Sequence, residues 1–149
     1  MSEIKKPFTV IESPFSAPTI DGLVRNVQYA MLAVRDSLDR GEAPYASHLF
    51  YTQMLDDNDE TERLRGMDAG LAICHYADQT AVYLDRGISR GMEYGIETAQ
   101  AARRDVVMRR MFSAALTASE IDIMIEREYA KHDLPAPKVI AEIYGRIIK

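Results

Sequence analysis

Polar side chains collect in three segments of the chain that could each follow a strand and face a ligand. The first segment covers residues 13–20, the second residues 47–57 and the third residues 85–91. Each comes after a short run that favours a strand. Because ligands of an open parallel sheet bind beyond the carboxyl ends of its strands, the side chains of these segments are the first candidates for chemistry.

The third segment, with the sequence DRGISRG, has the composition best suited to binding an anion or a sugar. Gly87 and Gly91 permit close approach of the backbone to a ligand, and Ser89 could cap the following helix while facing that ligand. Arg86 and Arg90 add positive charge where a helix amino terminus already favours an anion. The alternative is a tight turn with close helix packing and no ligand.

The first segment offers hydroxyl and backbone N–H groups but lacks the glycines and lysine of a Walker loop. It begins with Ser13, Pro14, Phe15 and Ser16. These groups could hold a sugar hydroxyl or a phosphate, or the segment could be a connection whose path the prolines fix. His48, in the second segment, could bind a ligand or transfer a proton, or bond only to the backbone.

Carboxylates near these segments are candidates for acid–base or nucleophilic chemistry. Asp85 ends an apolar run at the expected ligand edge of the sheet. Glu93 and Glu97 lie one turn apart on one face of a predicted helix, and a glutamate near a helix start could act as nucleophile or general base. The alternative for these glutamates is a solvated surface position.

The elements that would position these groups alternate between strands and helices. Apolar residues three and four positions apart predict helices, and short runs rich in β-formers predict strands. The alternation indicates an α/β fold, a flavodoxin-like or Rossmann-like three-layer sandwich with a parallel sheet of about four to five strands. The predicted strands cover residues 8–13, 43–47, 80–84 and 105–108; the predicted helices cover residues 21–41, 60–75 and 90–102; residues 48–59 are a predicted polar loop.

The last third of the chain has a different pattern, with helices only. Residues 117–120 fit a capping box at the start of one helix, and residues 139–148 form a second amphipathic pattern. We therefore divide the chain into an α/β domain over residues 1–112 and a C-terminal helical extension over residues 113–149. The extension could complete the core or form a surface for a partner subunit.

Composition favours one ordinary globular domain: 149 residues, of which 47% are hydrophobic and 28% charged. The net charge of −5 argues against broad binding to nucleic acid or anionic membranes, and no apolar run approaches the ~20 residues of a membrane helix. One cysteine and the lack of an apolar leader favour the cytoplasm. Small molecules and proteins remain as partners. No metal or cofactor is predicted, because the three histidines lack metal-ligand spacing.

Several short motifs follow one another in an order that resembles a known family. They are Ser13-Pro14-Phe15, Asn26, Ser47-His48, Ala77-Asp78 and Gly87-Ile-Ser-Arg-Gly91-Met92. In this order they resemble the nucleoside 2-deoxyribosyltransferase-like superfamily, in particular its small branches in bacteriophages and bacteria. The similarity covers about residues 8–108, so the C-terminal helices lie outside it.

The resemblance implies a flavodoxin-like fold that binds a nucleoside or nucleotide. Enzymes of the superfamily cleave the N-glycosidic bond, with a glutamate that attacks the anomeric carbon, and pass the sugar to another base or to water. Ser89 matches the family's hydroxyl residue before that glutamate, Gly91 its small residue, and Asp78 its aspartate before the strand. The resemblance also implies a homo-oligomer.

Two alignments of the helix that carries the nucleophile remain open. If Gly95 matches the glycine after the nucleophile, Glu93 takes the catalytic place. If Ala99 matches the family's downstream alanine, the catalytic place falls on Gly95, and the nucleophile is missing.

The leading hypothesis is N-glycosidic bond cleavage or deoxyribosyl transfer, with Glu93 as nucleophile and Asp85 orienting a hydroxyl or a base edge. One alternative is a protein that binds a nucleotide without cleaving it. Another is an interaction protein whose C-terminal helices build an oligomer. The residues expected to contact the substrate are Ser13, Pro14, Phe15, Ser16, Asn26, His48, Asp78, Gly87, Ser89, Arg90 and Gly91.

Overall fold

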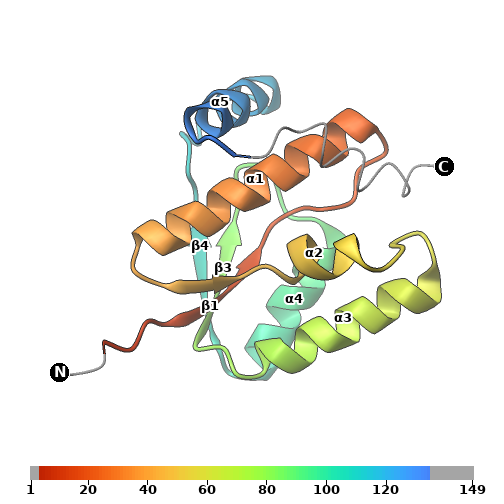
Figure 1. The fold of residues 1–149 in the computed structure, drawn as a ribbon. Helices are drawn as coiled ribbons and strands as arrows, with labels where there is room; N and C mark the ends of the chain where they lie inside the picture. Colours follow the sequence, from red (N-terminus) through yellow and green to blue (C-terminus); the bar gives the residue numbers. More distant parts are fainter. Residues whose placement is uncertain (1–3, 135–149) are drawn as a thin grey trace.

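The computed structural model describes residues 4–134, which form a parallel sheet between two layers of helices (Figure 1). Its strands are β1 (Phe8–Glu12), β2 (Ala43–Tyr45), β3 (Gln79–Tyr83) and β4 (Asp105–Arg109). Neighbouring strands all pair in parallel, in the order β2-β1-β3-β4. The predicted α/β fold with a parallel sheet is therefore confirmed, with four strands among the described residues.

The helices cover both faces of this sheet. They are α1 (Ile20–Asp39), α2 (Ser47–Phe50), the 3₁₀ turn η1 (Tyr51–Gln53), α3 (Glu60–Cys74), α4 (Arg90–Ala101) and α5 (Ala118–Lys131). Figure 1 shows α1 and α5 on one face of the sheet and α3 and α4 on the other. Parallel strands need such crossovers, because the chain must return to the same edge before each new strand.

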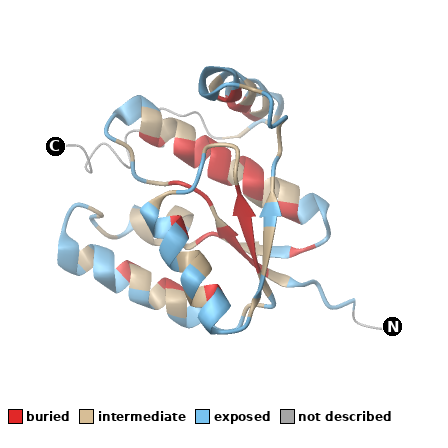
Figure 2. Ribbon diagram, turned by 180° about the vertical axis from the view of Figure 1, so that it is seen from behind, coloured by how far each residue is buried: buried red, intermediate tan, exposed pale blue. Residues whose placement is uncertain are grey.

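The two central strands form the core of the sheet, because helices cover them on both faces (Figure 2). Four of the five residues of β3 and three of the five residues of β1 are buried. Tyr29 and Ala33 of α1 belong to the same buried cluster as Ile11 and Ala81. A strand covered on both faces is apolar along its whole length, which explains why the sequence over residues 80–84 predicts a strand here.

The strand order places a topological switch point at the carboxyl end of β1. The crossover through α1 leads from β1 to its neighbour on one side, and the next crossover leads to β3 on the other side. Glu12, the last residue of β1, lies opposite Val82 of β3. Ligands of open parallel sheets bind in the crevice outside the strands at such a point. The residues after β1 and β3 therefore surround the expected crevice.

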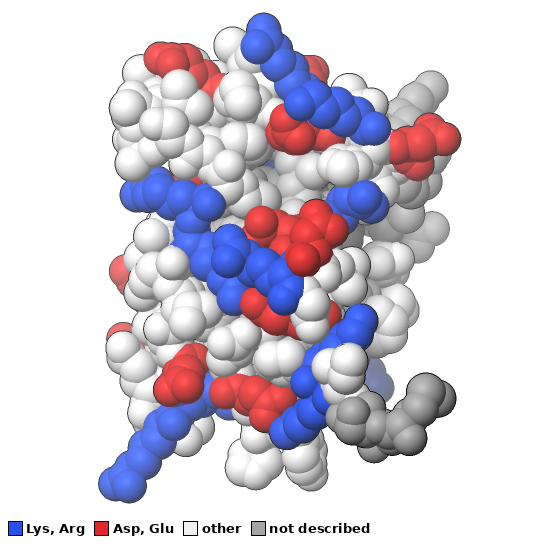
Figure 3. All heavy atoms as spheres, turned by 90° about the vertical axis from the view of Figure 1, so that its left-hand side faces the viewer, with Lys and Arg blue, Asp and Glu red and all other residues white. Residues whose placement is uncertain are grey.

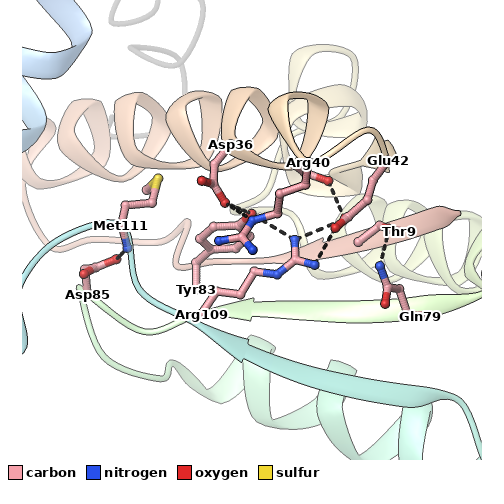
Figure 4. Close-up of polar contacts among 10 residues, drawn as sticks. Thr9, Asp36, Arg40, Glu42, Gln79, Tyr83, Asp85, Arg109 and Met111 are labelled. Carbon is pink, nitrogen blue, oxygen red and sulfur yellow. Dashed lines mark hydrogen bonds and ion pairs between the residues drawn. The ribbon is translucent and has the colours of Figure 1, made fainter. Parts of the chain in front are cut away.

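A buried polar network joins α1 to the sheet (Figure 4). Arg109 at the end of β4 donates two hydrogen bonds, of 2.5 and 3.1 Å, to the carboxylate of Glu42, and the Ser37 hydroxyl donates a third of 2.8 Å. Arg109 also donates to the Tyr83 hydroxyl, which donates to Asp36. Burial acts to raise the pKa of Glu42, but the hydrogen bonds from Arg109 and Ser37 outweigh it and lower that pKa.

The prediction of a plain polar loop over residues 48–59 is wrong. The short helix α2 and the turn η1 lie within that segment. Leu49 explains the difference, because its side chain packs against the core and draws the segment onto the protein. A single helical turn is too short for an apolar period to be recognised in the sequence.

Helical spacing of Leu64, Met67, Leu71 and Cys74 predicts that these four residues form the buried face of α3, and this prediction is wrong in part. Leu64 is 56% exposed, and the buried residues of α3 are instead Gly66, Gly70 and Cys74. Close packing explains why small residues occupy the buried face, because a Cβ atom at Gly70 would lie only 3.0 Å from the Cβ atom of Ser47. The inner face of α3 is thus made of small residues, which leaves space between α3 and the sheet.

The helix α5 packs on α1 and adds Ile121, Ile125 and Tyr129 to the core. It begins after Thr117, whose hydroxyl oxygen accepts from the Glu120 N–H at 3.2 Å, as the predicted capping box requires. The Glu120 carboxylate, however, accepts from the Thr117 hydroxyl. The predicted helix over residues 139–148 lies outside the described residues. No helix within residues 4–134 combines the length and the apolar character needed to cross a membrane.

Candidate functional site

A cleft of about 720 Å³ opens at the carboxyl ends of the strands. The segment after β1 forms one side, α2, η1 and α3 form the second side, and the first two turns of α4 form the third. The inner residues of α3 that line it include Gly66, Gly70 and Cys74, so the small side chains of that helix contribute directly to the space. The cleft therefore lies where the strand order predicts a ligand.

Glu12 brings a carboxyl group into this cleft from the end of β1. Its side chain is half-buried, and no hydrogen bond to its carboxyl group is found among the described residues. Burial raises the pKa of Glu12 to about 8, against the smaller opposing influence of the nearby Arg104 guanidinium. Glu12 is therefore mostly protonated at neutral pH, as a carboxyl group that donates a proton must be.

Sequence reasoning missed Glu12, because a single glutamate between an apolar run and a serine looked like the end of a strand. The available signal was its position, since Glu12 is the last residue of the central strand at the switch point. A carboxylate there is costly to bury without a partner. Such a cost is more often found at functional sites than elsewhere.

The helix α4 passes close to this carboxyl group at Gly95. A Cβ atom built on Gly95 would lie 2.1 Å from one carboxyl oxygen of Glu12 and 2.5 Å from its carboxyl carbon. Those distances are far too short for two unbonded atoms, so any side chain at position 95 would displace the carboxyl group. Gly91, one turn earlier, has no such neighbour, since its Cβ would meet only the Ser89 hydroxyl at 3.9 Å.

Ser13 and His48 form a hydrogen-bonded pair in the wall of the cleft. The Ser13 hydroxyl lies 2.8 Å from Nε2 of His48. Burial lowers the pKa of His48 to about 4, so its ring is neutral at neutral pH. The ring also packs edge-on against Phe15, with 6.4 Å between ring centres. A neutral imidazole fixes the orientation of the serine hydroxyl, which then meets a ligand in a defined direction.

Asn26 lies behind the segment that follows β1 and holds it in place. Its amide nitrogen donates to the carbonyl oxygens of Phe15 at 2.9 Å and Ser16 at 3.3 Å. Its amide oxygen accepts from Arg86 at 2.8 Å, and Arg86 also pairs with Asp122 of α5. Asn26 and Arg86 do not line the cleft. The structure therefore gives both residues a positioning role, in contrast to the predicted substrate contact of Asn26.

Asp85 likewise holds the backbone together. Its carboxylate accepts from the Tyr29 hydroxyl at 2.7 Å and from the backbone N–H groups of Met111 at 2.9 Å and Phe112 at 3.0 Å. These bonds fix the chain that leaves β4, as Figure 4 shows for Met111. Asp85 is not among the residues that line the cleft, so its predicted catalytic role finds no support in its position.

The amino terminus of α4 faces the cleft with polar groups. The Ser89 hydroxyl accepts from the Met92 N–H at 3.3 Å and so caps the helix, as predicted. Ser89, Arg90 and Gly91 all line the cleft. The positive end of the helix dipole and the Arg90 guanidinium both favour negative charge at this point.

Four further predicted site residues lie away from the cleft. Glu93 is exposed on α4, and Gly87 makes a turn with φ of +81°. Asp78 precedes β3 at the amino ends of the strands, where it accepts from the Phe8 N–H and pairs with Lys5. Since the amino and carboxyl ends lie at opposite edges of a parallel sheet, Asp78 is remote from the cleft. Pro14 is buried and does not line the cleft. The predicted residues that do line it are Ser13, Phe15, Ser16, His48, Ser89, Arg90 and Gly91.

Two other residues that line the cleft have a raised pKa. Burial raises the pKa of the Cys74 thiol to about 11, with a smaller contribution from Glu12, so the thiol is neutral at neutral pH. Burial also raises the pKa of Asp57, which lies on the side opposite α4. Within residues 4–134, no three His, Cys, Asp or Glu side chains gather as a metal site would require. Basic and acidic groups intermingle on the face shown in Figure 3.

Comparison with known proteins gives a family but no described activity. No curated protein and no solved structure matches the chain. A family model described as a domain of unknown function does match it, from the residue before β1 to the last residue of β4. The matched region contains the whole sheet and every residue that lines the cleft. The chain therefore belongs to the family described as Domain of unknown function (DUF7768), through its residues 7–109.

Proposed function

We propose that the cleft binds a nucleoside or nucleotide and that the protein cleaves its N-glycosidic bond. The observation that carries the proposal is the carboxyl group of Glu12, half-buried in the cleft at the switch point of the sheet. Most enzymes that cleave glycosidic bonds protonate the departing group with a carboxyl group that lies beside it. The order of motifs that resembles nucleoside 2-deoxyribosyltransferases supports the choice of a nucleoside as substrate.

In this proposal Glu12 acts as a general acid. Its proton passes to a nitrogen of the departing base while the bond between that base and the anomeric carbon breaks. The sugar is left with positive charge, which the new Glu12 carboxylate stabilises. Water then adds to the anomeric carbon, and its proton returns to Glu12. Burial suits this role because it keeps the carboxyl group protonated up to a pH of about 8.

Residues on the other walls of the cleft would bind the phosphate, the sugar and the base of the substrate. Ser89 and Arg90 lie where a phosphate or a sugar hydroxyl would meet the amino terminus of α4. Ser13, held by His48, offers a hydroxyl in the same cleft as Glu12. Tyr51 and Met67 on the opposite side provide apolar surface against which a base could stack.

A second candidate function is binding without cleavage. It is favoured by the absence of any carboxylate among the residues of α4 that line the cleft, since Glu93 is exposed on that helix. The predicted nucleophilic attack by Glu93 therefore has no support from its position. Under this second function, nucleotides bind but no base is released.

One experiment separates the two functions. The purified protein is incubated with nucleosides and nucleoside monophosphates, in both ribo and deoxy forms, and free base is measured by chromatography. We expect release of base by the native protein and by Glu93→Gln, and a loss of about a hundredfold or more in Glu12→Gln. The kcat/KM of the native protein should fall above a pH of about 8 as Glu12 loses its proton. Binding without base release would establish the second function.

A further inference from the structure

Glu12 of β1 and Gly95 of α4 are in close contact, and the distances between them indicate why position 95 is a glycine. Glu12 is part of β1, whereas Gly95 is in the middle of α4, yet a Cβ atom on Gly95 would lie 2.1–2.9 Å from the three atoms of the Glu12 carboxyl group. A glycine inside a helix costs about 1 kcal/mol relative to alanine. A close approach that only glycine allows is a physical reason for glycine to occupy that position.

The distances fit a carboxyl group attached at either position. In a glutamate, the carboxyl carbon is two carbon–carbon bonds from Cβ, which places it about 2.5 Å away. The carboxyl carbon of Glu12 lies 2.5 Å from the Cβ position of Gly95. A glutamate at position 95 could therefore place its carboxyl carbon at the distance from α4 that the Glu12 carboxyl carbon has now.

Among the described residues, the Arg104 guanidinium and the Cys74 thiol both interact electrostatically with the Glu12 carboxyl group. The Arg104 guanidinium donates to the Thr80 hydroxyl at 3.1 Å and to the Cys74 carbonyl oxygen at 2.8 Å, so it is held near Glu12 without bonding to it. The Cys74 thiol is a second titratable neighbour. The positions of both groups are the same whether the carboxyl group is attached to β1 or to α4, because neither is hydrogen-bonded to it.

We infer that positions 12 and 95 are two alternative attachment points for one carboxyl group of the cleft, and that Gly95 is the residue that admits Glu12 to it. This inference rests on the proposed function for its catalytic consequence. In this view α4 lacks a carboxylate in the cleft because β1 supplies the group. Gly95 is a positioning residue, since it acts through Glu12 and not on the substrate.

The decisive experiment moves the carboxyl group from one position to the other. Glu12→Ala should abolish base release, and the double variant Glu12→Ala/Gly95→Glu should restore at least about a tenth of it. The matched control is Glu12→Ala/Gly91→Glu, which adds a carboxylate to the same helix one turn away, where the structure leaves open space. Failure of the first double variant to recover activity, or equal recovery in the control, would overturn the inference.

A second measurement does not depend on activity and so separates this inference from the proposed function. Carbon NMR of the glutamate carboxyl groups should show that Glu12 titrates near pH 8 in the native protein. In Gly95→Ala the new methyl group should push the carboxyl group toward solvent and return its titration toward an ordinary value of about 4.3. Unchanged titration in a folded Gly95→Ala variant would refute the inference, even if the native protein releases base.

Discussion

Glu12 and Glu42 are both withdrawn from water, yet the protein treats their carboxyl groups in opposite ways. Glu42 has two hydrogen bonds from Arg109 and one from Ser37, and its pKa is lowered. Glu12 has Arg104 nearby but no hydrogen bond among the described residues, and its pKa is raised to about 8. Burial acts in the same direction on both groups, so their bonded partners make the difference.

The contrast separates a carboxylate that supports the fold from a carboxyl group kept available for a ligand. The donors around Glu42 all bond to other groups of the protein, and this network lies beneath α1 (Figure 4). Glu12 lines a cleft large enough for a small molecule. A group whose burial is not compensated within the protein is a better candidate for function than one that is fully paired.

The largest expected effect comes from removing each carboxylate in turn. Glu42→Gln should lower the free energy of unfolding by about 3–5 kcal/mol, because it leaves the Arg109 guanidinium buried without its counter-charge. Glu12→Gln should instead raise it at pH 7, because unfolding ionises Glu12 at that pH whereas a glutamine stays neutral in both states. Urea unfolding of both variants measures the difference. Equal losses in the two would contradict the contrast.

The pH dependence of stability gives the next effect. Because folding raises the pKa of Glu12 from 4.5 to about 8, the folded state binds one proton more than the unfolded state in that interval. Stability should then fall by about 1.4 kcal/mol for each unit of rising pH. His48 has the opposite sign, since its pKa falls from 6.5 to about 4 and stability rises with pH across that interval.

The two dependences oppose each other below a pH of about 6.5, so only the interval from about 6.5 to 8 isolates Glu12. The native protein and the control variant Glu93→Gln should both lose stability across this interval. Glu12→Gln should not. Urea midpoints at several pH values test this, and the same slope in all three proteins would show that Glu12 is not the group responsible.

The smallest expected effect is the removal of one hydrogen bond from the Glu42 network. Ser37→Ala should cost about 1 kcal/mol at neutral pH, because the Glu42 carboxylate keeps its two bonds to Arg109. It should also raise the pKa of Glu42 and so move the loss of stability on acidification to a higher pH. Thermal unfolding at pH 7 and pH 4 measures both changes. If Ser37→Ala lost as much stability as Glu42→Gln, the prediction would be wrong, and the bond from Ser37 would be the main stabilising contact of Glu42.

The fold was predictable because hydrophobic periodicity is a local property of the sequence. The apolar run over residues 80–84 and the spaced apolar residues of α1 each indicate one element and one buried face. Ser89 predicted the start of α4 for the same reason, because capping involves only nearby residues. The inner face of α3 was not predictable in this way, since it depends on Ser47 and on the space that small residues leave.

The candidate site was predictable as a place but not as a set of reacting groups. The segments after β1 and before α4 supply Ser13, Ser16 and Ser89 to the cleft, as their positions in the sequence indicate. Which carboxyl group reaches the cleft depends on how α4 lies against β1. That packing places Glu93 outside and makes Gly95 the close contact of Glu12. No pattern within α4 alone contains this information.

The ion pair between α5 and the loop before α4 connects the cleft to a helix outside the region that the family model matches. The family match ends at residue 109, before α5 begins. Yet Asp122 of α5 pairs with Arg86, which bonds to Asn26 behind the cleft, and Ile125 is buried in the common core. The region matched by the family model is thus smaller than the unit that folds here. A change in α5 can therefore alter the walls of the cleft while every residue that lines it stays the same.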